Sequence, residues 1–148
     1  MDALVSLVFS VYSNPGVYAL LLGSGVSRSA LIPTGWEITN DLIRKVAVIE
    51  GDALSSDLME WFQSKYGETP GYSQVLSKLG KTEAERNSLL RQYFEPTEEE
   101  RTQGNKLPTK AHRSIAKLVA KGYLRVIITT NFDRLMEEAL KEEGITPV

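Results

Sequence analysis

The residue types best suited to chemistry stand in two short polar segments, each directly after an apolar run. The first segment contains Gly23, Ser24, Gly25 and Ser27, and the second contains Thr129, Asn131 and Asp133. Small residues after a strand let backbone N–H groups approach an anion such as a pyrophosphate closely. An amide and a carboxylate can position a polar ligand through hydrogen bonds. The two segments together indicate a binding site for a ligand that carries a pyrophosphate.

Each segment also has a purely structural interpretation. A dinucleotide-binding loop of the form G-x-G-x-x-G needs glycine where this chain has Arg28, so a tight strand-to-helix turn explains the first segment equally well. In the second segment, Asn131 and Asp133 are residue types that cap helices, and a helix is expected next. The ligand interpretation is favoured because both segments would lie at one edge of a parallel sheet, where such sheets bind ligands.

Two apolar runs predict the strands that position these segments. Residues 17–22 and 125–129 are short and rich in Val, Ile and Leu, which is typical of parallel strands buried on both faces. Helices are predicted over 4–12, ended by Asn14-Pro15-Gly16; over 36–49, with Thr34 or Thr39 as N-cap; from Pro108-Thr109 to Gly122, with Ile115, Leu118 and Val119 on the apolar face; and over 134–141.

The middle of the chain, residues 50–106, predicts an all-helical insertion between the two strands. Its apolar side chains form three helical faces, and we expect its aromatic residues to form its core. The faces are Leu54, Leu58, Trp61 and Phe62; Val75, Leu76 and Leu79; and Leu89, Leu90, Tyr93 and Phe94. The polar, turn-rich residues 98–106 predict a linker or exposed loop at its end.

This order of elements predicts an α/β fold, a Rossmann-like parallel sheet that is incomplete in these residues. Residues 1–49 and 107–148 would form the Rossmann-like part, and 50–106 the helical insertion. Since two strands alone do not make a stable sheet, we expect residues 1–148 to be the N-terminal part of a larger domain.

Composition argues against several classes of function. The 17 Lys and Arg residues are balanced by 19 Asp and Glu residues, so no cationic patch for nucleic acid is indicated. The chain has no cysteine and His112 is its single histidine, so we expect no metal site in these residues. The longest apolar run is too short to cross a bilayer, and the N-terminus lacks the basic start of a secretory signal. We therefore expect no membrane partner and a cytoplasmic location.

Three segments, in order along the chain, resemble motifs of the sirtuins. Residues 23–36 read Gly-Ser-Gly-Val-Ser-Arg-Ser-Ala-Leu-Ile-Pro-Thr-Gly-Trp and are similar to the NAD-binding loop of that family, G-A-G-x-S-x-x-S-G-I-P. Residues 108–116 resemble the helix before the family's second key strand, and residues 129–133, Thr-Thr-Asn-Phe-Asp, resemble its T-Q-N-I-D segment. Thr130 replaces the glutamine and Leu31 stands where glycine is usual. Such departures are closer to bacterial sirtuin-like domains, several of which cleave NAD⁺ in anti-phage defence, than to the protein deacylases.

The resemblance implies hydrolysis of NAD⁺ to nicotinamide and ADP-ribose, with NAD⁺ as substrate. It assigns Ser24, Gly25 and Ser27, together with Gly23, to the pyrophosphate, and Ile32 to the nicotinamide pocket. Thr129 belongs to the second binding segment. Asn131 would hydrogen-bond near the nicotinamide ribose or orient a water molecule, and Asp133 would bind the carboxamide, so these two residues are the expected catalytic pair.

The family's general base is a histidine that follows the Asn-Asp segment, which the resemblance places beyond residue 148. His112 matches instead a histidine with a hydrogen-bonded packing role, so we expect these 148 residues alone to be nearly inactive. Two alternatives stay open. One is an inactive module that binds NAD⁺ or ADP-ribose for sensing or assembly, with a homo-oligomer or a C-terminal sensor domain as partner. The other is an NAD-dependent protein deacylase, which requires an acyl-lysine channel.

Overall fold

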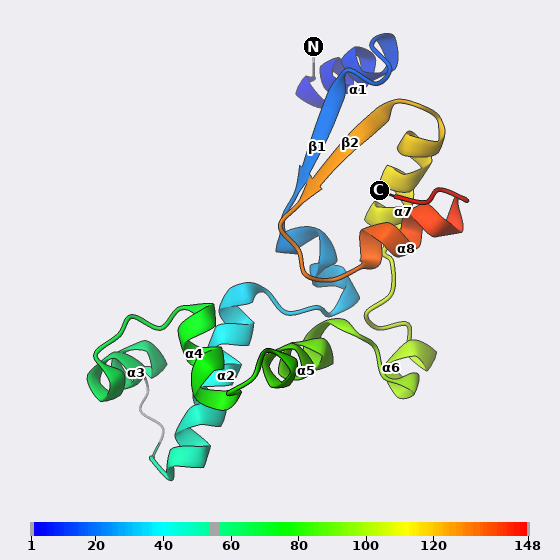
Figure 1. Ribbon diagram of the computed structural model, residues 1–148. Helices are drawn as coiled ribbons and strands as arrows, with labels where there is room; N and C mark the ends of the chain where they lie inside the picture. The colour runs from blue at the N-terminus through cyan, green and yellow to red at the C-terminus, as the bar shows by residue number, and fades with distance from the viewer. Residues whose placement is uncertain (1, 54–56, 148) are drawn as a thin grey trace. The chain divides into compact units, whose positions relative to one another are not determined.

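The computed structural model describes residues 2–53 and 57–147 and has a mixed α/β fold that is mostly helical (Figure 1). Its elements, in chain order, are α1 (Ala3–Ser13), β1 (Tyr18–Leu22), the 3₁₀ helix η1 (Ser24–Ala30), α2 (Gly35–Glu50), α3 (Leu58–Tyr66), α4 (Tyr72–Leu79), α5 (Glu83–Phe94), α6 (Glu98–Thr102), α7 (Lys110–Ala120), β2 (Leu124–Thr129) and α8 (Leu135–Glu142). The two strands pair in parallel, as predicted.

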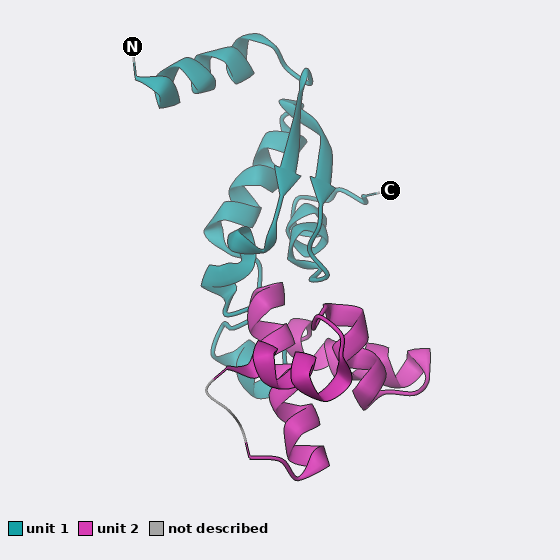
Figure 2. Cartoon of the chain, turned by 90° about the vertical axis from the view of Figure 1, so that its left-hand side faces the viewer, with its two compact units in different colours: residues 1–32, 96–148 teal, residues 33–95 magenta. Residues whose placement is uncertain are grey.

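The chain forms two compact units (Figure 2). Unit 1 contains residues 1–32 and 96–148, and unit 2 contains residues 33–95. The sequence pattern placed the insertion at 50–106, whereas the helical unit runs from 33 to 95 and includes α2. The physical reason is the apolar face of α2, since Leu42 and Ile43 are fully buried in one cluster with Phe62 and Val75 of α3 and α4.

Unit 2 has a closed apolar core made by α2, α3 and α4. Thr34, rather than Thr39, caps α2, because its hydroxyl accepts the N–H of Glu37 and the Glu37 carboxylate accepts the N–H of Thr34. The aromatic residues of the insertion pack in or against this core, as the sequence predicted: Trp61, Phe62, Tyr66, Tyr72, Tyr93 and Phe94. Leu54, which was assigned to the first helical face, lies outside the described residues.

The sheet of unit 1 is covered on one face only, so the prediction of strands buried on both faces is wrong. Leu22 is 7% exposed and packs with Met136 and Leu140 of α8, whereas its neighbour Leu21 is 71% exposed. The alternation follows the period of two in a strand. Helices α7 and α8 cover the face of Leu22, and on the opposite face Val126 and Ile128 of β2 are exposed as well.

Helix α1 forms where the sequence predicts it, and its N-cap is Asp2, whose carboxylate accepts the backbone N–H of Leu4. Helix α7 also forms as predicted, with Thr109 as its N-cap. Two of the expected apolar positions of α7, Ile115 and Val119, pack on the cluster beneath the sheet. Leu118 is 36% exposed and does not belong to that cluster.

The segment 98–106 is not simply a loop, because α6 forms within it. Thr97 and Glu100 make reciprocal side-chain and backbone hydrogen bonds that start this short helix. The ammonium of Lys106, whose side chain is 10% exposed, lies 2.8 Å from a carboxylate oxygen of Glu100. A polar composition alone could not reveal this helix, since the capping residues and the ion pair stabilise it locally.

Candidate ligand site at the carboxyl ends of the strands

The glycine-containing segment turns into η1 directly after β1. Gly23 has an extended backbone and precedes the helix, and no side chain caps this end. Ser27 and Ala30 are the buried residues of η1, whereas Gly23, Ser24 and Gly25 are exposed. Apart from the adjoining backbone, no atom of the described residues lies within 4 Å of the point that a Cβ on Gly25 would occupy. The chain itself therefore does not require glycine at position 25.

The second segment continues the parallel pairing beyond the end of β2. The N–H of Thr130 donates to the carbonyl of Leu22 at 3.1 Å, and the N–H of Asn131 donates to Oγ1 of Thr129 at 3.0 Å. These bonds hold the backbone of the segment against the end of β1. The side chain of Asn131 reaches across to η1, where its Nδ2 donates to Oγ of Ser27 at 3.3 Å. The structure thus brings together two of the residues that the sequence assigned to one site.

One polar atom at this edge of the sheet is buried without a hydrogen-bond partner among the described residues. It is the side-chain carbonyl oxygen Oδ1 of Asn131. A buried carbonyl oxygen without a hydrogen bond costs about 1–3 kcal/mol, and such atoms are uncommon in folded proteins. Asn131 could therefore accept a hydrogen bond from a hydroxyl or N–H group of a ligand.

Asp133 hydrogen-bonds the start of α8, but the N-cap of that helix is Arg134, so Asp133 is not its N-cap. The residue is 7% exposed, and its Oδ1 accepts the N–H of Leu135 in the first turn of α8 at 3.1 Å. Asn131 does not cap this helix. The two residues of the expected catalytic pair therefore differ: the Asp133 carboxylate bonds to the backbone, and the Asn131 amide bonds to Ser27.

His112 links the start of α7 to Ser27. Its ring is 1% exposed, and Nδ1 lies 3.2 Å from the backbone nitrogen of Thr109 and 2.7 Å from Oγ1 of that residue. Because a backbone N–H can only donate, Nδ1 accepts and the neutral ring carries its proton on Nε2. Nε2 then donates to Oγ of Ser27, 3.4 Å away. Ser27 thus accepts hydrogen bonds from both His112 and Asn131, and its own O–H can still donate.

Burial keeps His112 neutral. Desolvation lowers its pKa below the ordinary value of 6.5, and the positive charge of Arg113 acts in the same direction, while the Asp133 carboxylate opposes both. With Nδ1 used by Thr109 and Nε2 directed at Ser27, this histidine has a hydrogen-bonded packing role, as the sequence indicated. Sequence reasoning missed Thr109 as its partner, although the three-residue spacing of Thr109 and His112 at a helix start is the signal of a capping box.

The remaining expected residues are spread between the surface and the interior of unit 1. Thr129 is exposed at the end of β2, and Ile32 is buried, with 3% of its surface exposed. Leu31, which stands where the resembling motif has glycine, has a left-handed backbone with φ of 61°. Glycine adopts this conformation without steric cost, whereas leucine adopts it only with strain. The backbone of residue 31 thus gives a physical reason for glycine at this position.

Within residues 2–53 and 57–147, no group of three or more His, Cys, Asp or Glu side chains is arranged to hold a metal ion. No helix in the described part of the chain is long and apolar enough to cross a membrane. Comparison with protein-family models and with curated proteins finds no match to this chain.

Proposed function

We propose that this chain is the NAD⁺-binding part of a Rossmann-like, sirtuin-like NAD⁺ hydrolase. The observation that carries the proposal is the pairing of Asn131 with Ser27, which leaves the buried Oδ1 of Asn131 without a partner among the described residues. Both residues follow the carboxyl ends of parallel strands, the edge at which open α/β sheets bind nucleotides. The motif resemblance supplies the identity of the nucleotide.

In this proposal, water replaces nicotinamide at C1′ of the ribose. The C1′–N bond breaks, its electron pair neutralises the pyridinium ring, and the water oxygen bonds to C1′ and loses a proton. Nicotinamide leaves as a neutral molecule, so no acid has to protonate it. The protein must instead hold the ribose and water in place while positive charge develops on the sugar.

The residues at the strand ends fit this positioning role. Oδ1 of Asn131 would accept a hydrogen bond from a ribose hydroxyl or from the attacking water. Ser27 holds the Asn131 amide through Nδ2, and His112 holds Ser27 in turn. The exposed backbone of Gly23 to Gly25 would face the pyrophosphate. Asp133 would stabilise the segment through its bond to α8, and its second carboxylate oxygen would meet the carboxamide.

A second candidate function is binding without turnover, in which the same residues hold NAD⁺ or ADP-ribose for sensing or assembly. The state of His112 favours this candidate for residues 1–148. The histidine is buried and both of its ring nitrogens are used in hydrogen bonds within the chain, so it is unsuited to act as a general base.

Nicotinamide release from NAD⁺ by the complete gene product tests the proposal. Asn131→Ala should lower the rate at least about 100-fold, because it removes the group that positions ribose or water. Asn87→Ala, at an exposed position of α5, is the matched control and should leave the rate unchanged. The 148-residue chain run beside them should release almost none.

The outcomes separate the two candidates. Release by wild type and by Asn87→Ala, but not by Asn131→Ala, supports the hydrolase. Equal release by Asn131→Ala and wild type would contradict the assigned role of Asn131. Binding of NAD⁺ or ADP-ribose without release by any variant would replace the hydrolase with the binding module.

A further inference from the structure

In helix α1 the polar face contacts the rest of the chain and the apolar face is exposed, which is the reverse of the usual arrangement in a surface helix. Its small hydroxyl residues Ser6, Ser10 and Ser13 recur at spacings of four and three, so they share one face. The hydroxyl of Ser10 hydrogen-bonds the hydroxyl of Tyr18 in β1. The large apolar residues lie elsewhere on the helix and are 55–70% exposed: Leu4, Val5, Leu7, Val8, Phe9 and Tyr12.

A surface helix normally turns its apolar face toward the core and its polar face toward water. In α1 the serine face contacts β1 while the apolar face is exposed, so packing within this chain does not account for the apolar residues. Contiguous exposed apolar surface of this kind marks interaction sites in folded proteins.

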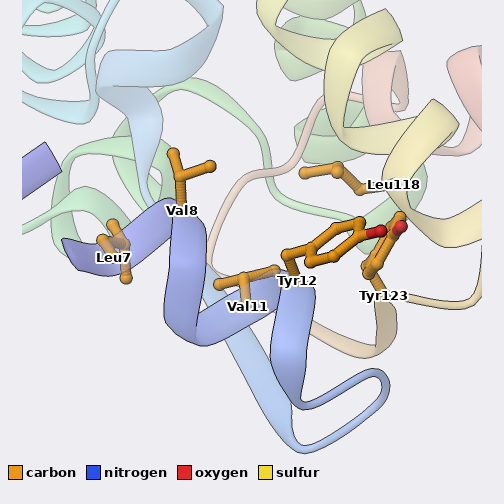
Figure 3. A pocket seen from close by; sticks show the side chains of 6 residues that line it. All are labelled: Leu7, Val8, Val11, Tyr12, Leu118 and Tyr123. Atoms are coloured by element: carbon orange, nitrogen blue, oxygen red, sulfur yellow. The ribbon is translucent and has the colours of Figure 1, made fainter. Parts of the chain in front are cut away.

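The apolar face of α1 includes one wall of a groove with a volume of about 290 Å³ (Figure 3). The groove is lined by Leu7, Val8, Val11 and Tyr12 of α1, and by Leu118 and Tyr123 at the end of α7 and after it. The rings of Tyr12 and Tyr123 lie against each other with their centroids 5.9 Å apart. Beside the groove, Val5 and Phe9 are four residues apart and form an exposed ridge on the same helix.

The absence of charged side chains on α1 indicates which kind of partner fits this groove. Helix α1 has no charged side chain over its 11 residues, whereas every other α-helix in the described part of the chain has at least one. An occupant without charges avoids the cost of burying them in an apolar groove. The α1 ridge of another copy has this chemistry, and each copy then supplies one ridge and one groove, as a twofold interface requires.

We propose that two copies of this chain pair through α1, with the helices antiparallel and the ridge of each copy seated in the groove of the other. Asp2 selects the orientation, because a parallel pair would bring the two N-terminal carboxylates together. An antiparallel pair separates them and opposes the two helix dipoles. The helix is about 16 Å long, so the interface is smaller than the standard 20–30 residues per partner. We therefore expect a reversible dimer, weak enough to follow between about 1 and about 100 μM.

Sedimentation equilibrium of the purified chain tests the pairing, from about 1 to about 100 μM. Wild type should shift from monomer to dimer over this range. Val8→Glu places a carboxylate on the groove wall and should raise the dissociation constant at least about tenfold. Val48→Glu in α2 is the matched control, because Val48 is 70% exposed in unit 2 and the substitution is the same. This control should dimerise as wild type does.

Disulfide cross-linking tests the antiparallel register and does not depend on a charge. The chain has no cysteine, so a single introduced thiol reports on one position. Val8 lies at the middle of α1, where antiparallel helices cross, so Val8→Cys should form a disulfide-linked dimer on oxidation. Val48→Cys should stay monomeric on a denaturing gel.

A wild-type chain that is monomeric throughout the concentration range would overturn the proposal. A dimer that Val8→Glu leaves unchanged would also overturn it, as would equal cross-linking by Val8→Cys and Val48→Cys. If far-UV circular dichroism shows that Val8→Glu unfolds α1, the cross-linking result decides.

Discussion

The two units use polar side chains for different purposes. In unit 2, lysine side chains link neighbouring helices at the edge of a closed core through ion pairs and cation–π contacts. Lys45 of α2 pairs with Asp41 and lies over the ring of Tyr93 of α5, and Lys65 of α3 pairs with Glu50 of α2. In unit 1, the buried polar groups of η1, α7 and the end of β2 converge on Ser27.

The two units also differ in how far their apolar residues are buried. The core of unit 2 is closed, with Phe62, Leu42 and Ile43 fully buried. In unit 1 the helices cover one face of the sheet, and α1 is exposed. The closed core accounts for the buried apolar residues of unit 2, whereas Trp36, Val48 and Ile49 are exposed in this unit too. Unit 1 differs in its buried polar cluster around Ser27, and we therefore propose that the functional site lies in unit 1.

The largest effect is expected in the closed core. Phe62→Ala should lower the free energy of unfolding of unit 2 by about 3–5 kcal/mol, because it removes a fully buried ring and leaves a cavity. Both tryptophans, Trp36 and Trp61, lie in unit 2, so urea unfolding followed by tryptophan fluorescence reports on this unit. Val48→Ala, at a 70% exposed position, should change stability by less than about 0.5 kcal/mol. Equal losses in the two variants would show that the core of unit 2 is not closed.

Adjacent leucines of β1 test the one-sided burial of the sheet. Leu22→Ala should destabilise unit 1 by about 2–5 kcal/mol, whereas Leu21→Ala should cost less than about 1 kcal/mol, because Leu22 is 7% exposed and Leu21 is 71% exposed. Hydrogen exchange of the β2 amides measures both effects within unit 1. A cost for Leu21→Ala that matches Leu22→Ala would mean that both faces of the sheet are covered in solution.

The buried histidine gives unit 1 a specific pH dependence. Because folding lowers the pKa of His112, the unfolded chain takes up the proton first as the pH falls through the ordinary value of 6.5. The free energy of unfolding should therefore decrease between pH 7 and pH 5.5, with a slope of at most about 1.4 kcal/mol per pH unit.

His112→Gln should remove this slope. Carboxylates with lowered pKa, such as Asp41 and Glu142, also lose stabilising interactions as the pH falls, but their ordinary values of 3.8 and 4.5 place that loss below this window. Hydrogen exchange of unit 1 at several pH values measures the effect. An unchanged slope in His112→Gln would show that the histidine is not the group that titrates.

The smallest effect is at most an increase in stability, whereas Phe62→Ala and Leu22→Ala are both expected to lower it. Leu31→Gly should leave unit 1 equally stable or stabilise it by up to about 1 kcal/mol, because glycine relieves the left-handed strain at φ of 61° but has more entropy to lose on folding. Leu118→Gly, in a regular turn of α7, should instead destabilise by about 1 kcal/mol. Thermal unfolding compares the two variants, and a loss in Leu31→Gly as large as in Leu118→Gly would contradict the strain at position 31.

Local signals made much of the fold predictable. The short apolar runs predicted both strands, Thr109 marked the start of α7, and Thr34 was one of the two N-caps offered for α2. The exposed outer face of the sheet could not be predicted, since an apolar run has the same pattern whether a helix covers it or not. For the same reason, the periodicity of α1 predicted a helix without showing that its apolar face is exposed.

The site was predictable to the level of its segments. The rule that parallel strands end at one edge brought Ser27 and Asn131 together, as the structure does. The different partners of Asn131 and Asp133 were not predictable, because both residue types can accept an N–H at a helix start and only the backbone of residues 129–135 brings Asp133 to Leu135. The link from Thr109 through His112 to Ser27 depends on the tertiary fold, which joins residues far apart in the chain.

The most direct test of the ligand site is an NMR titration of the ¹⁵N-labelled 148-residue chain with NAD⁺. We expect chemical-shift changes confined to the amides of residues 23–32 and 129–133, retained in Asn87→Ala and lost in Asn131→Ala. No shift in the wild-type chain, or the same shifts in Asn131→Ala, would contradict the assignment of the ligand site to the strand ends.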